Sequence, residues 1–148
     1  MSSKSLIGYI DVRVFVHATE DPEKVLTAVR SILPVELGEN TDFQKTILSG
    51  HHGNPILLFK AKLADKQALL GVLQKIGESL IPLDREKLDD ELKLHLDKQN
   101  LYLRFDKQFA YKKKVKFSQN DPIHFKIHFK NKSFEKIVEV CKKTRLLP

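Results

Sequence analysis

The sequence predicts an α+β fold in which helices pack on one face of an antiparallel or mixed sheet and leave the other face open and basic. Several segments alternate apolar and polar residues with the two-residue period of a strand, and others carry apolar residues at helical spacing. Their order lacks the regular βαβ alternation of a parallel sheet. The 148 residues are long enough to form a single domain, 1–148, in which 1–6 and 143–148 are expected to be mobile ends.

The first 97 residues are predicted to form three strands and three helices. The first strand alternates two sets of residues, Ile10, Val12, Val14 and Val16 on one side and Asp11, Arg13, Phe15 and His17 on the other. The segment 19–23 then supplies an N-cap, a proline for the first helical turn and acidic residues near the unpaired amides, so a helix is expected up to Pro34. Strands are expected at 43–48 and 56–63, and helices at 65–80 and 84–97.

The rest of the chain is predicted to contribute three strands and a final helix. Strands are expected at 101–106, 115–118 and 123–130, and the helix begins after a Ser133 cap. The strand 123–130 alternates most regularly, with Ile123, Phe125, Ile127 and Phe129 on one side and His124, Lys126, His128 and Lys130 on the other. A strand that buries one side and offers cations on the other suits a polyanionic partner.

Charge is distributed unevenly along the chain. It carries 26 Lys or Arg and 19 Asp or Glu, a net charge of +7. Residues 1–97 hold 12 basic against 15 acidic residues, whereas residues 98–148 hold 14 against 4. A basic excess confined to one segment is typical of nucleic-acid binding, although an acidic protein partner or an anionic membrane surface would also account for it.

The single cysteine and the hydropathy of the chain indicate in which cellular compartment the protein is expected. The single cysteine, Cys141, cannot form an internal disulfide, and its place in an apolar periodic run predicts a buried core thiol. The first five residues are too few and too polar for a signal sequence, and no apolar run approaches the ~20 residues of a membrane span. We therefore expect a cytoplasmic protein without a membrane partner.

If the strands alternate as predicted, cations and aromatic rings collect on the exposed face of the sheet. Such a face suits single-stranded RNA, because Lys and Arg neutralise phosphates while aromatic rings stack on unpaired bases. Two alternatives remain open, a solvated face whose lysines prevent aggregation and one half of a homodimer interface. The predicted face comprises Arg13, Phe15, His17, Tyr102, Arg104, Lys114, Lys116, His124, Lys126 and His128.

The segment 103–111 combines several side chains suited to RNA. Arg104 offers a planar fork for phosphate or a base edge, Gln108 can read a base, and Tyr111 can stack. In the alternative, Arg104 pairs internally with an acid such as Asp106 or Asp11.

The segment 50–55 is rich in glycine. It reads Gly-His-His-Gly-Asn-Pro, and the amides of its glycines could cradle a phosphate beside the His51 imidazole. A plain hairpin turn requires the same glycines, so both interpretations stay open.

The sequence predicts neither a metal site nor a cofactor. His124 and His128 would lie about 13 Å apart on a strand, too far to share one ion. No phosphate-binding loop with its lysine and no Ser, Cys and His arrangement with catalytic spacing is present. We expect a protein that is not an enzyme; the alternative is a nuclease that uses Asp106 with a nearby histidine.

Three stretches, 16–25, 50–56 and 101–111 followed by 121–123, together resemble an archaeal family of RNA-binding or predicted exosome-subunit proteins. The resemblance spans about residues 7–130. It implies an α+β sandwich similar to the large-subunit ribosomal protein that holds the five-S RNA, and a partner that is RNA or an exosome or ribosomal complex. The positions that match the family's motifs are His17, His51, Gly53, Asn54, Arg104, Asp106, Lys107, Gln108 and Tyr111.

One position departs from the family's pattern. Lys113 stands where the family tends to have a glycine two residues after the tyrosine. Either the turn there does not need a positive φ, or this chain has a different tip with extra charge. Taken together, the sequence predicts a non-enzymatic RNA-binding protein, accessory to RNA processing or the ribosome, with a homodimeric interaction module as the alternative.

Overall fold

The computed structural model describes residues 6–50, 53–130 and 133–148. Its centre is a six-stranded antiparallel sheet with the strand order β2-β3-β1-β6-β5-β4, which confirms the predicted α+β class. Strands from both halves of the sequence share this sheet, because β1 pairs with β3 on one side and with β6 on the other. The strands are β1 (Ile7–Val16), β2 (Gln44–Ser49), β3 (Pro55–Leu63), β4 (Leu96–Asp97), β5 (Asn100–Phe105) and β6 (Ile123–Phe129).

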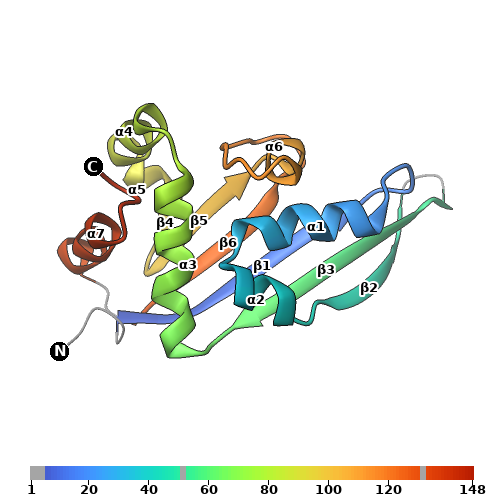
Figure 1. Ribbon diagram of the computed structural model, residues 1–148, viewed down its shortest axis with the longest axis horizontal. Helices are drawn as coiled ribbons and strands as arrows, with labels where there is room; N and C mark the ends of the chain where they lie inside the picture. Colours follow the sequence, from blue (N-terminus) through green and yellow to red (C-terminus); the bar gives the residue numbers. More distant parts are fainter. Residues whose placement is uncertain (1–5, 51–52, 131–132) are drawn as a thin grey trace.

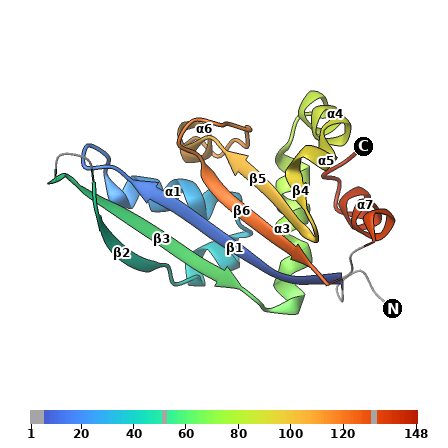
Figure 2. The same ribbon diagram turned by 180° about the vertical axis from the view of Figure 1, so that it is seen from behind.

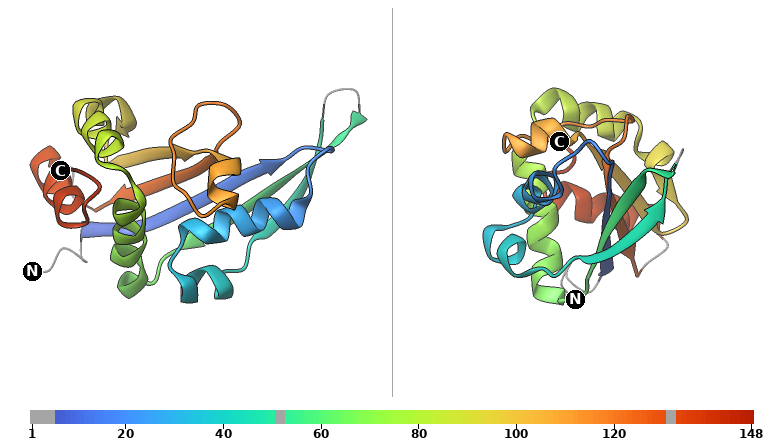
Figure 3. Two further views of the ribbon diagram at one scale, coloured as in Figure 1. Left: turned by 45° about the horizontal axis from the view of Figure 1, so that its top comes forward. Right: turned by 90° about the vertical axis from the view of Figure 1, so that its right-hand side faces the viewer.

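Helices α1, α2 and α3 lie across one face of the sheet (Figure 1). Seen from behind, the opposite face of β1, β3, β5 and β6 has no helix over it (Figure 2), and the end-on view in Figure 3 shows the same separation into two layers. The helices are α1 (Pro22–Ile32), α2 (Val35–Asn40), α3 (Lys66–Ser79), α4 (Pro82–Asp90), α5 (Leu92–His95), α6 (Lys107–Tyr111) and α7 (Phe134–Lys143). In the part of the chain that the structure describes, no helix is long and apolar enough to cross a membrane.

Alternation along the strands separates the two faces. On β1, Ile10, Val12 and Val14 are buried beneath the helices, whereas Arg13 on the opposite face is exposed. The caps predicted from sequence also form: the Asp21 carboxylate accepts a hydrogen bond from the Glu23 amide at the start of α1, and the Ser133 hydroxyl accepts from the Lys136 amide at the start of α7.

Two predicted elements are wrong in detail. The helix expected at 84–97 begins earlier and is broken at Glu91 into α4 and α5, after which Leu96 joins the sheet opposite Leu101. The strand expected at 115–118 does not form; only one isolated bridge joins Phe117 to Phe105. Residues 107–111 before that bridge form α6, and a turn at 112–113 follows the helix.

The C-terminal end is packed, contrary to the mobile end expected at 143–148. Leu146 and Leu147 are buried in the hydrophobic core. Gly77 of α3 allows this approach, since a Cβ at that position would overlap the carbonyl group of Thr144. Cys141 is buried as predicted, and burial raises the pKa of its thiol to about 12, so the thiol is held in its unreactive protonated form.

Candidate nucleic-acid interface

A row of cationic and polar side chains crosses the open face of the sheet. In strand register, Lys60 of β3 lies opposite Arg13 of β1, Arg13 lies opposite His124 of β6, and His124 lies opposite Arg104 of β5. Neighbouring strands are about 4.8 Å apart, so these four residues span about 14 Å across the sheet. Segments remote in sequence therefore meet in one line, which we call the cationic row.

A second row runs beside the first. Lys62 of β3 and Lys126 of β6 lie opposite Asp11 of β1 from its two sides, and Tyr102 of β5 lies opposite Lys126. On β3, β1, β6 and β5 the paired residues of the two rows comprise five Lys or Arg and a single carboxylate, that of Asp11. The open face thus carries an excess of positive charge without the helical layer contributing to it.

The two rows form the floor of a hollow of about 710 Å³. This volume is in the range of pockets that hold small ligands, and it is large enough for a nucleotide unit. Half of its polar lining residues are Lys or Arg, and the lining includes two carboxylates and an amide that could bind the edge of a base or a sugar hydroxyl. The lining side chains with charged or polar ends are Asp11, Arg13, Asp42, Gln44, Lys60, Lys62, Tyr102, Arg104, His124 and Lys126.

Tyr9 and Tyr102 both lie on this face, but they differ in whether the ring is free to stack on a base. The ring of Tyr9 stacks on His128 at a centroid distance of 4.6 Å, and the Lys62 ammonium lies 4.4 Å from its centroid. A hydrogen bond with Tyr9 also raises the pKa of Lys126. Tyr102 has no ring or cation–π partner among the described residues, so it is the tyrosine whose face can receive a base.

His124, at the centre of the cationic row, is partly buried and lies between two arginines. Partial burial lowers its pKa, and the positive charges of Arg13 and Arg104 on the two neighbouring strands lower it further. The imidazole is therefore neutral at physiological pH in the free protein. His128, by contrast, forms a 2.8 Å hydrogen bond with the side-chain oxygen of Asn100.

Arg104 is not paired with an acid, contrary to the alternative considered above. Its Nη1 donates to the side-chain oxygen of Gln119 at 3.3 Å, and no ion pair joins it to Asp106 or Asp11 among the described residues. Asp106 instead caps α6 by accepting a hydrogen bond from the Phe109 amide. The guanidinium is exposed and remains able to bind an anion.

Five of the predicted RNA-binding residues lie on or just after α6 and not on the sheet: Lys107, Gln108, Tyr111, Lys114 and Lys116. Gln108 and Tyr111 belong to the short helix itself, which packs against α1, where the Ser31 hydroxyl donates to the Ala110 carbonyl. Lys114 follows the helix in an exposed turn, and the Lys116 ammonium lies 5.9 Å from the centroid of the Phe109 ring. None of them joins the cationic row: the residues of α6 lie on a helix, and the segment that carries Lys114 and Lys116 forms no strand.

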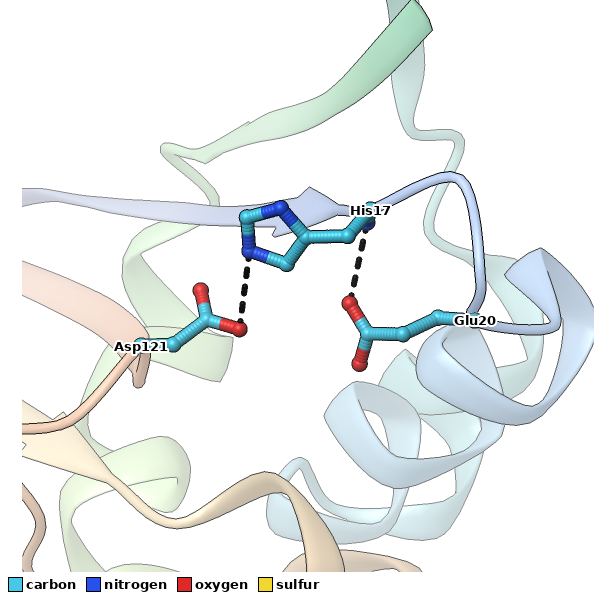
Figure 4. Close-up of side chains that lie close together, drawn as sticks. All are labelled: His17, Glu20 and Asp121. Carbon is cyan, nitrogen blue, oxygen red and sulfur yellow. Dashed lines mark hydrogen bonds and ion pairs between the residues drawn. The ribbon is translucent and has the colours of Figure 1, made fainter. Parts of the chain in front are cut away.

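His17 and Lys107 belong to a polar cluster between the end of β1 and the start of β6. His17 Nε2 lies 3.0 Å from Asp121 Oδ2, and the His17 amide donates to Glu20 (Figure 4). The Lys107 ammonium donates to the Phe15 carbonyl, to Glu20 at 3.1 Å and to Asp121 at 2.8 Å. Lys107 is therefore engaged internally and is not offered to a phosphate.

This cluster has the three ligand types of a metal site, His17, Glu20 and Asp121. However, the same Asp121 oxygen that faces His17 also binds the Lys107 ammonium. A cation of the protein itself thus already neutralises the carboxylates. We interpret the cluster as a lock, a set of ion pairs that joins the end of β1, the loop between β1 and α1, α6 and the segment before β6.

The glycine-rich loop lies at the tip of the β2–β3 hairpin. Gly53 has a φ of +79°, and its amide donates to the Gly50 carbonyl, as a tight turn requires. Gly53 and Asn54 are exposed, and His51 lies outside the described residues, together with His52. Strands β2 and β3 are paired up to Ser49 opposite Pro55, and Gly53 and Asn54 do not line the hollow.

Six residues of the interface were not among the predicted binding residues: Tyr9, Asp11, Asp42, Gln44, Lys60 and Lys62. Lys60 and Lys62 alternate with Phe59, Ala61 and Leu63, a two-residue period that could have placed them on the open face. Tyr9 precedes the part of β1 in which alternation was recognised. Three lysines of α7 and the three at 112–114 make up six of the 14 basic residues of the C-terminal segment, and they lie away from this face. The distribution of charge along the sequence therefore located only part of the face.

The chain is similar in sequence to a known protein family. A protein family described as RNA binding matches residues 9–129. RNA-binding protein PAB1135 of Pyrococcus abyssi is 36% identical over 133 residues, which cover 88% of this chain and 86% of that protein.

Solved structures agree in fold. Protein AF2318 of Archaeoglobus fulgidus is 27% identical with a TM-score of 0.78, and 93% of this chain and 99% of that chain are covered. Mth689 of Methanothermobacter thermautotrophicus, called a DUF54 protein, is 30% identical with a TM-score of 0.75, and the coverage is 97% and 99%. This chain belongs to the RNA-binding family that these archaeal relatives represent.

Proposed function

We propose that this protein binds single-stranded RNA on the open face of its sheet, without catalysing a reaction, as an accessory to RNA processing by an exosome-like complex or to the ribosome. The observation that carries the proposal is the cationic row, in which Lys60, Arg13, His124 and Arg104 are direct cross-strand neighbours. The named relative is itself called an RNA-binding protein.

The geometry suits a flexible, unpaired strand. Lys60, Arg13 and Arg104 can neutralise successive phosphates across the sheet, and Tyr102 in the adjacent row can stack on a base. Asp11, Asp42 and Gln44 line the same hollow and provide acceptors and a donor for base edges. A concave face also contacts splayed-out bases better than the regular surface of a duplex.

The residues considered for catalysis, Asp106 and a nearby histidine, have other partners. The nuclease alternative required Asp106, but this carboxylate caps α6. Among the described residues, the histidine that pairs with an acid is His17, and its partner Asp121 also binds the Lys107 ammonium. We therefore keep binding, and not turnover, as the proposed activity.

Titration of a fluorescently labelled single-stranded RNA at several salt concentrations tests the proposal. Each neutralised phosphate should contribute about 0.7 to the slope of log affinity against log salt. We expect Lys60→Glu and Lys126→Glu to weaken binding for every RNA sequence and to reduce that slope by about one contact each. Absence of binding by the unaltered protein at low salt would refute the proposal.

Lys45→Glu is the matched control for Lys60→Glu. Lys45 lies on the neighbouring strand β2 opposite Phe59, whose side chain is buried beneath the helices, so Lys45 is exposed on the other side of the sheet. The two variants change net charge equally. If both weaken RNA binding to the same extent, total charge and not this face is responsible.

The alternative of a homodimeric interaction module has a distinct outcome. Sedimentation of the unaltered protein and of Lys126→Glu reports association state independently of RNA. A variant that changes association state but retains its RNA affinity would favour the interaction module over the proposed function.

A further inference from the structure

We propose that RNA binding on this face is coupled to the uptake of one proton by His124, which completes a phosphate site between Arg13 and Arg104. This inference rests on the proposed function and assigns a specific role to the residue at the centre of the cationic row. It makes affinity for RNA dependent on pH near neutrality.

The first argument is geometric. His124 of β6 is the direct cross-strand partner of both Arg13 of β1 and Arg104 of β5, and all three line the same hollow. The strands are about 4.8 Å apart, so a phosphate bridging the two guanidinium groups must lie over the imidazole. A protonated imidazole can donate a charge-assisted hydrogen bond to that phosphate.

The second argument concerns the charges that surround His124 before RNA arrives. Arg13 on β1, Arg104 on β5 and Lys107 on α6 all oppose protonation, whereas Asp121, in the segment before β6, favours it. Partial burial is the largest cause, and the balance lowers the pKa of His124 below its usual value. The free protein thus avoids a third positive charge between two arginines.

A phosphodiester reverses this balance. Its negative charge offsets those of Arg13 and Arg104 and favours the charged imidazolium, so the pKa of His124 is higher in the complex than in the free protein. Between these two values, binding takes up a proton and affinity rises as pH falls. Above the pKa of the complex, affinity no longer depends on this group.

The experiment measures affinity for an oligouridylate with 5′-hydroxyl ends between about pH 5.5 and 7.5, at constant ionic strength. Uracil and the phosphodiester do not titrate in this range, so the RNA contributes no proton of its own. One proton limits the effect to about a tenfold gain in affinity per pH unit, and we expect a gain approaching that limit.

His124→Gln should bind more weakly at low pH and lose most of the pH dependence. His128→Gln is the matched control, because His128 lies on the same strand and face but is stacked on Tyr9, bonded to Asn100 and absent from the lining of the hollow. The control should retain the full pH dependence. Unfolding of each variant, followed by circular dichroism, shows whether the fold is preserved.

Imidazole chemical shifts of the unaltered protein give a second readout that needs no variant. The titration midpoint of His124 should move upward when oligouridylate is added. RNA binding with an unshifted midpoint, or with equal pH dependence in His124→Gln, would overturn the proton coupling and leave the proposed function standing. No RNA binding at any pH would instead overturn the proposed function.

Discussion

Lys107 on α6 and Asp121 before β6 form an ion pair of 2.8 Å, although 14 positions separate them in the sequence. The lysine also binds Glu20 and the Phe15 carbonyl, and only 11% of its side chain is exposed. One ammonium thus joins the segments at which β1 ends and β6 begins. Strands β1 and β6 are the two central strands of the sheet, and they carry Arg13 and His124.

The first prediction concerns this lock. Lys107→Met keeps an unbranched side chain of similar shape but leaves Glu20, Asp121 and the Phe15 carbonyl without their shared donor. We expect a loss of about 1–3 kcal/mol in the free energy of unfolding. Urea unfolding measures it, and Lys114→Met, which removes an exposed lysine, should change stability by less than about 0.5 kcal/mol. Equal losses in the two variants would contradict the lock.

The second prediction concerns the turn after α6. Lys113 has a φ of +64°, so the turn uses the left-handed conformation that favours glycine. The first interpretation given for Lys113, a turn without a positive φ, is therefore wrong. We expect Lys113→Gly to raise the free energy of unfolding by up to about 1 kcal/mol. Lys112→Gly removes the same charge at a residue with a φ of −89° and should not stabilise the protein. A loss of stability in Lys113→Gly would refute this.

The third prediction distinguishes the two tyrosines proposed to stack on bases. Tyr102 lines the hollow, whereas Tyr111 ends α6 and does not. Tyr102→Ala should weaken RNA binding by about 1–3 kcal/mol, and Tyr102→Phe should retain most of the affinity because the ring remains. Tyr111→Ala should have little effect in the same polarisation titration. The reverse order would move the binding site to α6.

The fourth prediction concerns the C-terminal end. Leu146 is fully buried, so Leu146→Ala should cost about 2–5 kcal/mol of unfolding free energy, measured by urea denaturation. Leu94 is 83% exposed, and Leu94→Ala serves as the control with an expected change within about 0.5 kcal/mol. A negligible effect of Leu146→Ala would mean that the end is mobile in solution, as the sequence alone predicted.

Strand alternation and helix capping predicted most of the fold, because both depend on interactions between residues that are close in the sequence. Alternation in 10–16 and 123–130 correctly separated buried from open residues, and thereby brought Arg13, His124 and Lys126 to one face. Capping residues located α1, α3 and α7 within one or two positions. These signals do not depend on the rest of the chain.

Errors arose where distant contacts decide the structure. Val115 and Phe117 alternate like a strand, but Asp106 caps a helix that packs on α1, and the segment keeps only the bridge to Phe105. The packing of Leu146 depends on the close approach of Thr144 to Gly77 in α3, which nothing near the C-terminus indicates. The engagement of Lys107 depends likewise on Glu20 and Asp121.

Helices α1, α2 and α3 lie on one face of the sheet, and the other face has no helix over it in the described part of the chain (Figure 2). The cationic row lies on that other face, because its residues alternate with those buried beneath the helices. The residues that hold the molecule together and the residues available to a ligand are therefore almost separate sets. Substitutions on the open face can therefore change which ligand is bound with little effect on the free energy of unfolding. The same fold can thus recognise different ligands while its core stays unchanged.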